Sequence, residues 1–300
     1  MWNGKRKATL LCFRQIIFLT LHIRMHTKTK VVMAAFAALT VLSFAEPARQ
    51  REVATDDSQY VLVFSDEFNQ SNGSQPDTTK WSRCPRYHSL WNRWVSDSKK
   101  VLYIKGGKLV CRAIPNRTEK ADTARMLTGA IWSRDKYAFK YGKLLVRMKT
   151  NVYDGNFPAA WLGQQRPAGQ QMPYGEIDVV EMFGKKKESN HNIHTQLTVN
   201  NPKHGQKNSF KHSVDVTKWH VYGIEWTPDY VKWTVDDETV GIYNKSTDKN
   251  LLSKHQWTFD SDYYILLNQS VGNGVHDMKQ DVNRVYETQF DWIRVYQKQK

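Results

Sequence analysis

Three acidic residues lie within six positions of one apolar segment, GEIDVVEMF at residues 175–183. They are Glu176, Asp178 and Glu181. Two carboxyl groups held about 5 Å apart can hydrolyse a glycosidic bond with retention of configuration. One carboxylate attacks the anomeric carbon, while the other, protonated, delivers a proton to the leaving oxygen. The segment therefore predicts this chemistry, provided that the three side chains share one face.

Strand geometry places the first two acids together and leaves the third on the wrong side. Side chains at positions i and i+2 of a strand share a face, so Glu176 and Asp178 point the same way. Regular alternation would bury Glu181, which is costly for an unpaired carboxylate. One extra residue, a β-bulge at Val179–Val180, returns Glu181 to the face of the other two. The rival interpretation is a solvated face whose acids pair with nearby Lys and Arg residues.

The bulge would also give the three acids separate tasks. With it, Glu176 and Glu181 become an i, i+4 pair whose side chains can lean toward each other to the required separation. Asp178, shorter and between them, can hydrogen-bond the nucleophile and help to hold the two glutamate pKa values apart.

The rest of the chain must supply strands to position this segment, and short β-rich runs between turn signals recur throughout it. No stretch of ten residues shows convincing helical periodicity. Together the runs predict an all-β sandwich of two sheets in a single domain. The expected strands cover residues 60–64, 101–114 with a break at Gly106–Gly107, 140–150, 175–183, 192–199, 220–227, 230–237, 263–271 and 290–297.

The first 45 residues are expected to be a leader rather than part of this domain. Residues 31–45 form an apolar run behind Lys28 and Lys30, and Ser43–Phe44–Ala45 fits the small-x-small cleavage rule. Cleavage after Ala45 leaves residues 46–300 as one domain. Residues 1–24 are unusual before such a signal and suggest an upstream start codon. We expect a secreted, periplasmic or cell-surface protein with no membrane span, because fifteen apolar residues are too few.

Charge and cysteine content exclude few functions. Residues 1–45 contain seven of the 44 Lys and Arg residues and none of the 29 acids, so the remainder carries a net charge of about +8. Its basic residues are scattered apart from Lys185–Lys187, and no nucleic-acid partner is expected. Cys84 and Cys111 are either one disulfide or two buried thiols. The 11 Trp residues favour a carbohydrate ligand, because indole rings stack on sugar faces.

The segment EIDVVE resembles the catalytic signature of glycoside hydrolase family 16 in its bulged E-x-D-x-x-E form. The resemblance extends in order across nearly all of residues 46–300. Its other elements are FSDEFN (64–69) with Lys80–Trp81, FKYGKLLVRMK (139–149), NFPAAWL (156–162), YGIEWTPD (222–229), LLNQSVGNG (266–274) and FDWIRVYQ (290–297). The family implies a jelly-roll β-sandwich of two antiparallel sheets, whose concave sheet forms a cleft for polysaccharides.

The resemblance also implies roles for particular residues. Glu176 resembles the nucleophile, Asp178 the auxiliary acid and Glu181 the general acid/base. Trp161 resembles a sugar platform, whereas Phe157 departs from the Trp found there in many relatives. The remaining implied substrate-binding residues are His194, Trp91, Asn92, Arg93, Trp94, Asn268 and Gln269.

No catalytic cofactor is expected, but a structural calcium ion is implied. Glu67, the Gly107 carbonyl and Asp291 match the ligand positions of relatives, and Ca²⁺ prefers hard oxygen ligands. The alternative at these positions is an ordinary turn.

These features predict a monomeric, endo-acting, retaining β-glycanase with a polysaccharide as its partner. The first substrate hypothesis is β-1,3-glucan or mixed-linkage β-1,3-1,4-glucan. The second is a β-galactan such as agar or porphyran, supported by the basic charge, because Arg and Lys pair with sulfate esters. A third hypothesis, from another class, is a non-catalytic carbohydrate-binding sandwich.

Overall fold

The structure is a computed structural model that describes residues 59–203, 205–272, 276 and 278–299. The expected leader, residues 1–45, lies outside the described residues.

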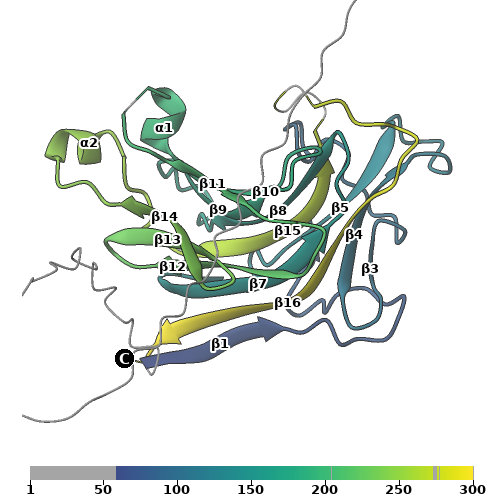
Figure 1. Ribbon diagram of the computed structural model, residues 1–300, viewed down its shortest axis with the longest axis horizontal. Coiled ribbons are helices and arrows are strands. Elements are labelled where there is room, and N and C mark those ends of the chain that lie inside the picture. Colours follow the sequence, from purple (N-terminus) through teal and green to yellow (C-terminus); the bar gives the residue numbers. More distant parts are fainter. Residues whose placement is uncertain (1–58, 204, 273–275, 277, 300) are drawn as a thin grey trace, which may run out of the picture. The chain divides into compact units, whose positions relative to one another are not determined.

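Sixteen strands and two short helices make up the described chain (Figure 1). The helices are α1 (Gln196–Asn200) and α2 (Lys249–Ser253). The strands are β1 (Tyr60–Asp66), β2 (Ser82–Arg83), β3 (Leu102–Ile104), β4 (Leu109–Pro115), β5 (Met126–Trp132), β6 (Ala138–Phe139), β7 (Gly142–Thr150), β8 (Asn156–Gln164), β9 (Gly175–Glu181), β10 (Glu188–Thr195), β11 (Ser209–Ser213), β12 (His220–Trp226), β13 (Tyr230–Val235), β14 (Glu238–Asn244), β15 (Tyr263–Val271) and β16 (Tyr286–Lys298).

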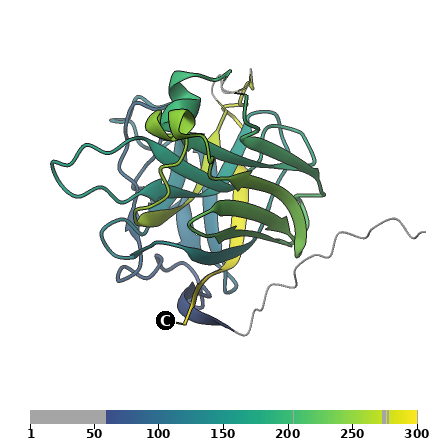
Figure 2. The same cartoon turned by 90° about the vertical axis from the view of Figure 1, so that its left-hand side faces the viewer.

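The strands form two layers of antiparallel sheet, which Figures 1 and 2 show from perpendicular directions. One layer has the order β11-β10-β9-β8-β15-β5, and the other has the order β4-β16-β7-β12-β13-β14. The layers are continuous at one edge, where Ala113–Pro115 of β4 pair with Met126–Thr128 of β5. The expected sandwich is therefore confirmed, with its two sheets joined at that edge. The acid-bearing strand β9 lies inside the first layer, between β8 and β10.

Alternating side chains fill the space between the layers. In β7, Leu144, Val146 and Met148 are buried, while the residues between them are partly exposed. Large aromatic side chains complete the core, and Trp226 and Trp233 are fully buried in it. Burial of this much apolar surface is the main force that stabilises the sandwich.

The chain from 192 to 199 was expected to be one strand, and its second half is a helix. Strand β10 ends at Thr195, and α1 begins at the next residue. The Thr195 hydroxyl accepts a hydrogen bond from the Thr198 N–H, and the Thr195 N–H in turn donates one to the Thr198 hydroxyl. This capping box starts the helix despite the β-favouring residues that follow. Figures 1 and 2 show α1 beside α2, and the Leu197 N–H donates to the His255 carbonyl just beyond α2.

Two central strands, β5 and β8, were not expected as strands. Strand β8 contains Pro158, which lacks the N–H of a regular ladder and normally marks an edge or a break. Strand β5 is almost entirely buried, so it lacks the polar alternation that identifies a strand in sequence. Both lie next to β15 in the acid-bearing layer.

Cys84 and Cys111 are free and buried, which decides between the two alternatives for these residues. Each thiol lies in an apolar environment, and burial raises the pKa of both. They therefore act as small core residues.

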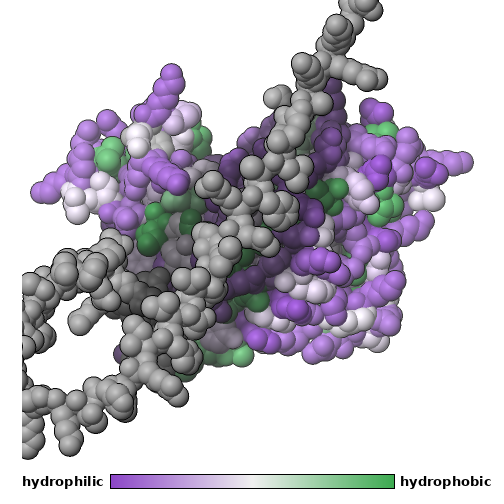
Figure 3. Space-filling view, viewed as in Figure 1, coloured by the Kyte–Doolittle hydropathy of each residue, from purple (hydrophilic) through white to green (hydrophobic). Residues whose placement is uncertain are grey.

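The surface of the described chain is largely polar in the view of Figure 3, with separate small hydrophobic patches. Within the described ranges, neither helix is long and apolar enough to cross a membrane.

In the segment FSDEFN at residues 64–69, Asp66 has a structural role, and its side chain is buried, with 2% exposed. Its carboxylate accepts hydrogen bonds from the Trp81 indole N–H (2.7 Å) and the Phe68 backbone N–H (2.8 Å). Lys80 donates to the Ser65 carbonyl at 2.7 Å. The Lys80–Trp81 pair therefore fixes the end of β1 to the core.

We expect Asp66→Ala to lower the free energy of unfolding by about 2–4 kcal/mol, because two donors lose a buried acceptor. Denaturant titration would measure the change. The control is Asp229→Ala at an exposed turn, which should cost no more than about 0.5 kcal/mol. Equal stability of the two variants would contradict this role of Asp66.

Candidate active site

Strand β9 contains a bulge at the position where the acid spacing required one. Against β8, Asp178 pairs with Trp161 and Val180 with Ala160, so Val179 is an extra residue. The register against β10 shifts at the same place, between Asn190 and Asn192. Val179 and Val180 are both fully buried, whereas Glu181 is partly exposed. The Glu181 side chain therefore points away from the core, as the parity argument predicted.

Side chains from other strands hold the backbone of the bulge. The Trp233 indole donates to the Asp178 carbonyl at 2.8 Å, and His191 Nδ1 donates to the Val179 carbonyl at 2.6 Å. The His191 Nε2 then accepts from the Ser189 hydroxyl at 2.9 Å. Burial lowers the pKa of His191 to about 4, so the ring is neutral with its proton on Nδ1.

Each of the three acids has a distinct neighbour. Glu176 accepts a hydrogen bond from the Tyr174 hydroxyl at 2.7 Å. Asp178, whose side chain is 3% exposed, lies 3.3 Å from Nε2 of His194, which is directly across the ladder from Glu176. Glu181 accepts from the Asn192 amide at 2.7 Å. His194 Nε2 is also 3.8 Å from Glu176, so the imidazole bridges two acids.

The crowding of acids shifts their pKa values upward. Burial, followed by repulsion from Asp178, raises the pKa of Glu176 to about 7. Burial also raises the pKa of Glu181 well above its usual range, with repulsion from Asp178 and Glu176 adding to the effect. Although burial alone lowers the pKa of His194, its hydrogen bond to Asp178 and the nearby acids raise that pKa to about 9.

These neighbours decide which glutamate keeps a proton. The Tyr174 hydroxyl and the protonated His194 both stabilise an ionised Glu176. Glu181 has the neutral Asn192 amide as its hydrogen-bond donor and repels two other acids. The arrangement therefore favours an ionised Glu176 beside a protonated Glu181.

A hollow of about 380 Å³ begins at Glu176 and runs across the sheet. Its lining residues come from β9, β8 and β15, which are consecutive in the layer, and from three loops: the one that follows β5, the one between β2 and β3, and the one between β8 and β9. They are Trp91, Arg134, Trp161, Gly163, Gln164, Arg166, Tyr174, Gly175, Glu176 and Tyr264. Aromatic rings and polar groups line it together, as sugar-binding sites require.

Trp161 and Trp91, both predicted to bind substrate, lie in this hollow. Their rings meet edge to face at 5.2 Å between centroids. The Trp161 indole donates to the Asn268 amide oxygen at 2.9 Å. Asn268 was predicted to bind substrate, but it is only 2% exposed and instead orients Trp161.

The prediction that Gln269 binds substrate is wrong. Its side chain is fully buried and bonds to Asn156 and Thr288 inside the sandwich. Asn268 and Gln269 are consecutive in β15, so their side chains must point to opposite faces.

Other predicted binding residues lie outside the lining of the hollow. Asn92 is 3% exposed and accepts a hydrogen bond from Ser89 within its own turn. Trp94 packs on a separate core cluster, with the Arg93 guanidinium 5.6 Å from its ring centroid. Phe157 is 8% exposed, and its ring packs against Phe183 at 5.2 Å.

Several residues at the site were missed from sequence. Asn192 could have been found, because it lies two positions before His194 and therefore shares its face. Tyr174 directly precedes the acid-bearing strand, which is a weak signal. Arg134 and Arg166 lie in loops, where no periodicity indicates the direction of a side chain.

The residues proposed to bind calcium do not fit that ion in this arrangement. Arg294 donates two hydrogen bonds to the Glu67 carboxylate, at 2.8 and 2.9 Å. Asp291 is paired with Arg147 and with Lys108. A calcium ion would have to displace these cations before it could use either carboxylate.

The described residues contain one group of at least three metal-ligand side chains, formed by Glu176, Asp178 and His194. Their ligand atoms lie within 4.8 Å of one another. The raised pKa of His194 favours its protonated form, which cannot act as a metal ligand.

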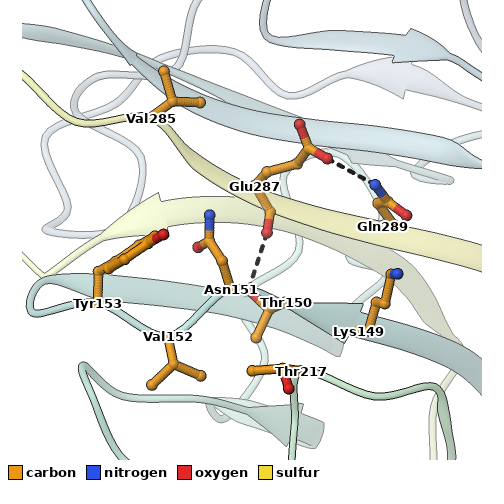
Figure 4. Close-up of a pocket in the computed structure, with 9 residues that line it drawn as sticks. All are labelled: Lys149, Thr150, Asn151, Val152, Tyr153, Thr217, Val285, Glu287 and Gln289. Carbon is orange, nitrogen blue, oxygen red and sulfur yellow. Dashed lines mark hydrogen bonds between the residues drawn. The ribbon is translucent and has the colours of Figure 1, made fainter.

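A second hollow, of about 550 Å³, lies between the ends of β7 and β16 in the other layer (Figure 4). It is lined by Lys149, Thr150, Asn151, Val152, Tyr153, Thr217, Val285, Glu287 and Gln289. None of these is a predicted site residue, and none is one of the three acids.

The chain is similar to known proteins of one family. The family model described as glycosyl hydrolases family 16 matches residues 91–281. A keratan-sulfate endo-1,4-β-galactosidase from Sphingobacterium multivorum is 31% identical over 81% of this chain. A glucan endo-1,3-β-glucosidase A1 from Niallia circulans is 29% identical over 79% of it. The matches span 56% and 38% of those two proteins, respectively.

The solved structures include the laminarinase from Rhodothermus marinus, with a TM-score of 0.67 and 25% identity. The superposition covers 80% of this chain and 98% of that one.

We expect Tyr174→Phe to move the acid limb of the kcat/KM profile to higher pH, by up to about one unit. The Tyr174 hydroxyl stabilises the ionised form of Glu176, so its loss should raise the pKa of that carboxyl further above its ordinary value. The family resemblance implies that Glu176 is the nucleophile, which must be ionised to react. On that assignment, activity would disappear at a higher pH as the solution is acidified.

The control is Tyr264→Phe, which changes the same hollow without removing a hydrogen bond to Glu176. An unchanged acid limb in Tyr174→Phe, or an equal displacement in both variants, would show that Tyr174 does not tune Glu176.

Proposed function

The chain belongs to glycosyl hydrolases family 16, and from this premise we propose that it is an endo-acting, retaining β-glycanase in which Glu176 is the nucleophile and Glu181 the general acid/base. The observation that supports these roles is the β9 bulge, which brings both glutamates and Asp178 to one partly exposed site.

In the first step, the ionised Glu176 attacks the anomeric carbon and forms an ester bond as the glycosidic C–O bond breaks. Glu181 gives its proton to the leaving oxygen. In the second step, the Glu181 carboxylate takes a proton from water, whose oxygen attacks the anomeric carbon and releases Glu176. Asp178 and His194 adjust the charge around the nucleophile throughout. Side chains supply all of this chemistry, and members of the family need no catalytic cofactor.

Two substrate classes remain candidates. Hydrolysis of β-1,3-glucan or mixed-linkage β-1,3-1,4-glucan is supported by the glucanase and laminarinase relatives. Hydrolysis of a β-galactosidic bond is supported by the keratan-sulfate endo-1,4-β-galactosidase relative and by two arginines, Arg134 and Arg166, in the hollow beside Glu176. The arginines are the specific observation that favours the second class, because a neutral glucan does not require them.

A non-catalytic carbohydrate-binding role is less well supported. Binding a sugar requires aromatic rings and hydrogen-bonding groups, but it does not require two glutamates whose neighbours favour opposite protonation states. Such an arrangement is costly to maintain without a catalytic use.

We further propose that the protein is exported, that residues 1–45 are removed, and that the mature chain is monomeric. Export rests on the sequence pattern of the leader alone. The extracellular or periplasmic location would bring the enzyme to polysaccharides too large to enter a cell.

Our prediction for the nucleophile is that Glu176→Ser lowers hydrolysis of the best polysaccharide substrate by at least about 10⁴-fold while oligosaccharide binding persists. A reducing-sugar assay and calorimetric binding would measure the two effects. Hydrolysis close to the original rate would refute the assignment of Glu176.

The other two acids should respond differently. Glu181→Ala should be severe, but azide should partly restore turnover of substrates with good leaving groups, because those groups depart without a proton. Asp178→Asn should cause an intermediate loss of about 10- to 100-fold, because the amide still hydrogen-bonds but the charge is lost. If azide rescued Glu176→Ser with unchanged stereochemistry and failed with Glu181→Ala, the two roles would have to be exchanged.

Laminarin, lichenan, agarose, porphyran and keratan sulfate form a panel that separates the substrate classes. Reducing-sugar release from the two glucans would support the first class, and release from the last three polysaccharides would support the second.

A further inference from the structure

We propose that Arg134 and Arg166 form an anion-recognising subsite that selects a sulfate ester on the sugar bound beside Glu176. The inference rests on the proposed glycanase function and names a feature of its substrate. Both residues line the same hollow as Glu176, Trp91 and Trp161. That hollow therefore combines aromatic platforms, the nucleophile and two positive charges.

The two guanidinium groups are not neutralised as other arginines of this chain are. Four arginines elsewhere form short ion pairs with acids, namely Arg86 with Asp122, Arg112 with Glu287, Arg147 with Asp291, and Arg294 with Glu67. Among the described residues, Arg166 forms no ion pair with a carboxylate, and its Nε donates to the neutral Gln164 amide at 3.1 Å.

Arg134 has only a weak acidic neighbour. Its Nε is 3.8 Å from Asp135, whose side chain is 73% exposed and already accepts a hydrogen bond from Gln165. The same Nε is buried and has no hydrogen-bond partner within the described part of the chain. No hydrogen bond to another described residue uses the Nη groups of Arg134 or Arg166, so these donors remain for a ligand.

Aromatic rings hold these guanidinium groups in place. Arg134 lies 5.3 Å from the Trp132 ring centroid and 5.9 Å from that of Tyr264. Arg166 lies 6.0 Å from the centroid of Tyr174, the residue that donates to Glu176. Contacts with aromatic faces reduce the entropy that an arginine loses when it binds an anion.

Electrostatics explains why an anionic substrate would need such a pair. The ionised Glu176 and Asp178 repel a negatively charged sugar in the same hollow. Two guanidinium groups offset that repulsion, and their planar N–H groups match the oxygens of a sulfate. Glu176 lines the hollow and Glu181 does not. We therefore place the sulfate on the part of the polysaccharide that becomes covalently bonded to Glu176, and not on the part that leaves.

The test uses Glu176→Ser, which should bind without hydrolysing, and keratan sulfate oligosaccharides before and after chemical desulfation. Calorimetry should show tighter binding of the sulfated form by about 10- to 100-fold. Adding Arg134→Gln or Arg166→Gln should remove most of that preference and leave the affinity for the desulfated form within about twofold. The control is Arg117→Gln, an exposed position outside the hollow, which should keep the preference.

Equal affinity for the two forms, binding of neither, or an equal loss on both forms in the arginine variants would each overturn the anion subsite. Hydrolysis by the unsubstituted protein is a separate readout. If the protein binds the sulfated form selectively but releases no reducing sugar from any polysaccharide in the panel, the proposed function fails and the subsite stands. If it hydrolyses glucans and shows no sulfate preference, the subsite fails and the glycanase stands.

Discussion

Two carbonyl groups in the bulge of β9 need hydrogen-bond donors inside the sandwich, and the site depends on the residues that supply them. Trp233 and His191 donate to the carbonyls of Asp178 and Val179, respectively. Without such partners, buried carbonyls would make the bulge unfavourable by several kcal/mol. With them, Val179 and Val180 both enter the core, and the strand resumes its alternation with Glu181 on the outer side. A local backbone irregularity thus converts a strand into a site with three acids on one face.

The bulge also creates an electrostatic problem that the neighbouring side chains moderate. Three acids in a partly buried cluster repel one another, and this repulsion adds to burial in raising the pKa of both glutamates. His194 offsets part of the repulsion from a position directly across the ladder. Its protonation, the Tyr174 hydroxyl and the Asn192 amide make the environments of Glu176 and Glu181 unequal. That inequality allows one fold to present a nucleophile and an acid at the same pH.

Local sequence rules could predict what depends on strand parity. The bulge followed from the spacing of Glu176 and Glu181. Parity could also have identified Asn192, and it could have shown that the consecutive residues Asn268 and Gln269 cannot both face the substrate. The rules failed where tertiary contacts decide the outcome: the Thr195 capping box ended β10 early, and Pro158 occurs in a central strand. The arginines of the hollow could not have been predicted, because their positions depend on loops packing against Trp132, Tyr264 and Tyr174. Glu67 and Asp291 match the positions of calcium ligands in relatives, but in the structure they pair with Arg294 and Arg147, respectively. Sequence position alone does not reveal such pairing.

The central claim is that the bulge presents Glu176 as a nucleophile, and covalent trapping tests it most directly. An activated 2-deoxy-2-fluoro glycoside of the preferred sugar slows the second step and leaves the sugar attached to the enzyme. Peptide mass spectrometry should then locate one added sugar on Glu176, with no label on the Glu176→Ser variant. A label on Glu181 or Asp178, or hydrolysis with inversion and no trapped species, would contradict the account.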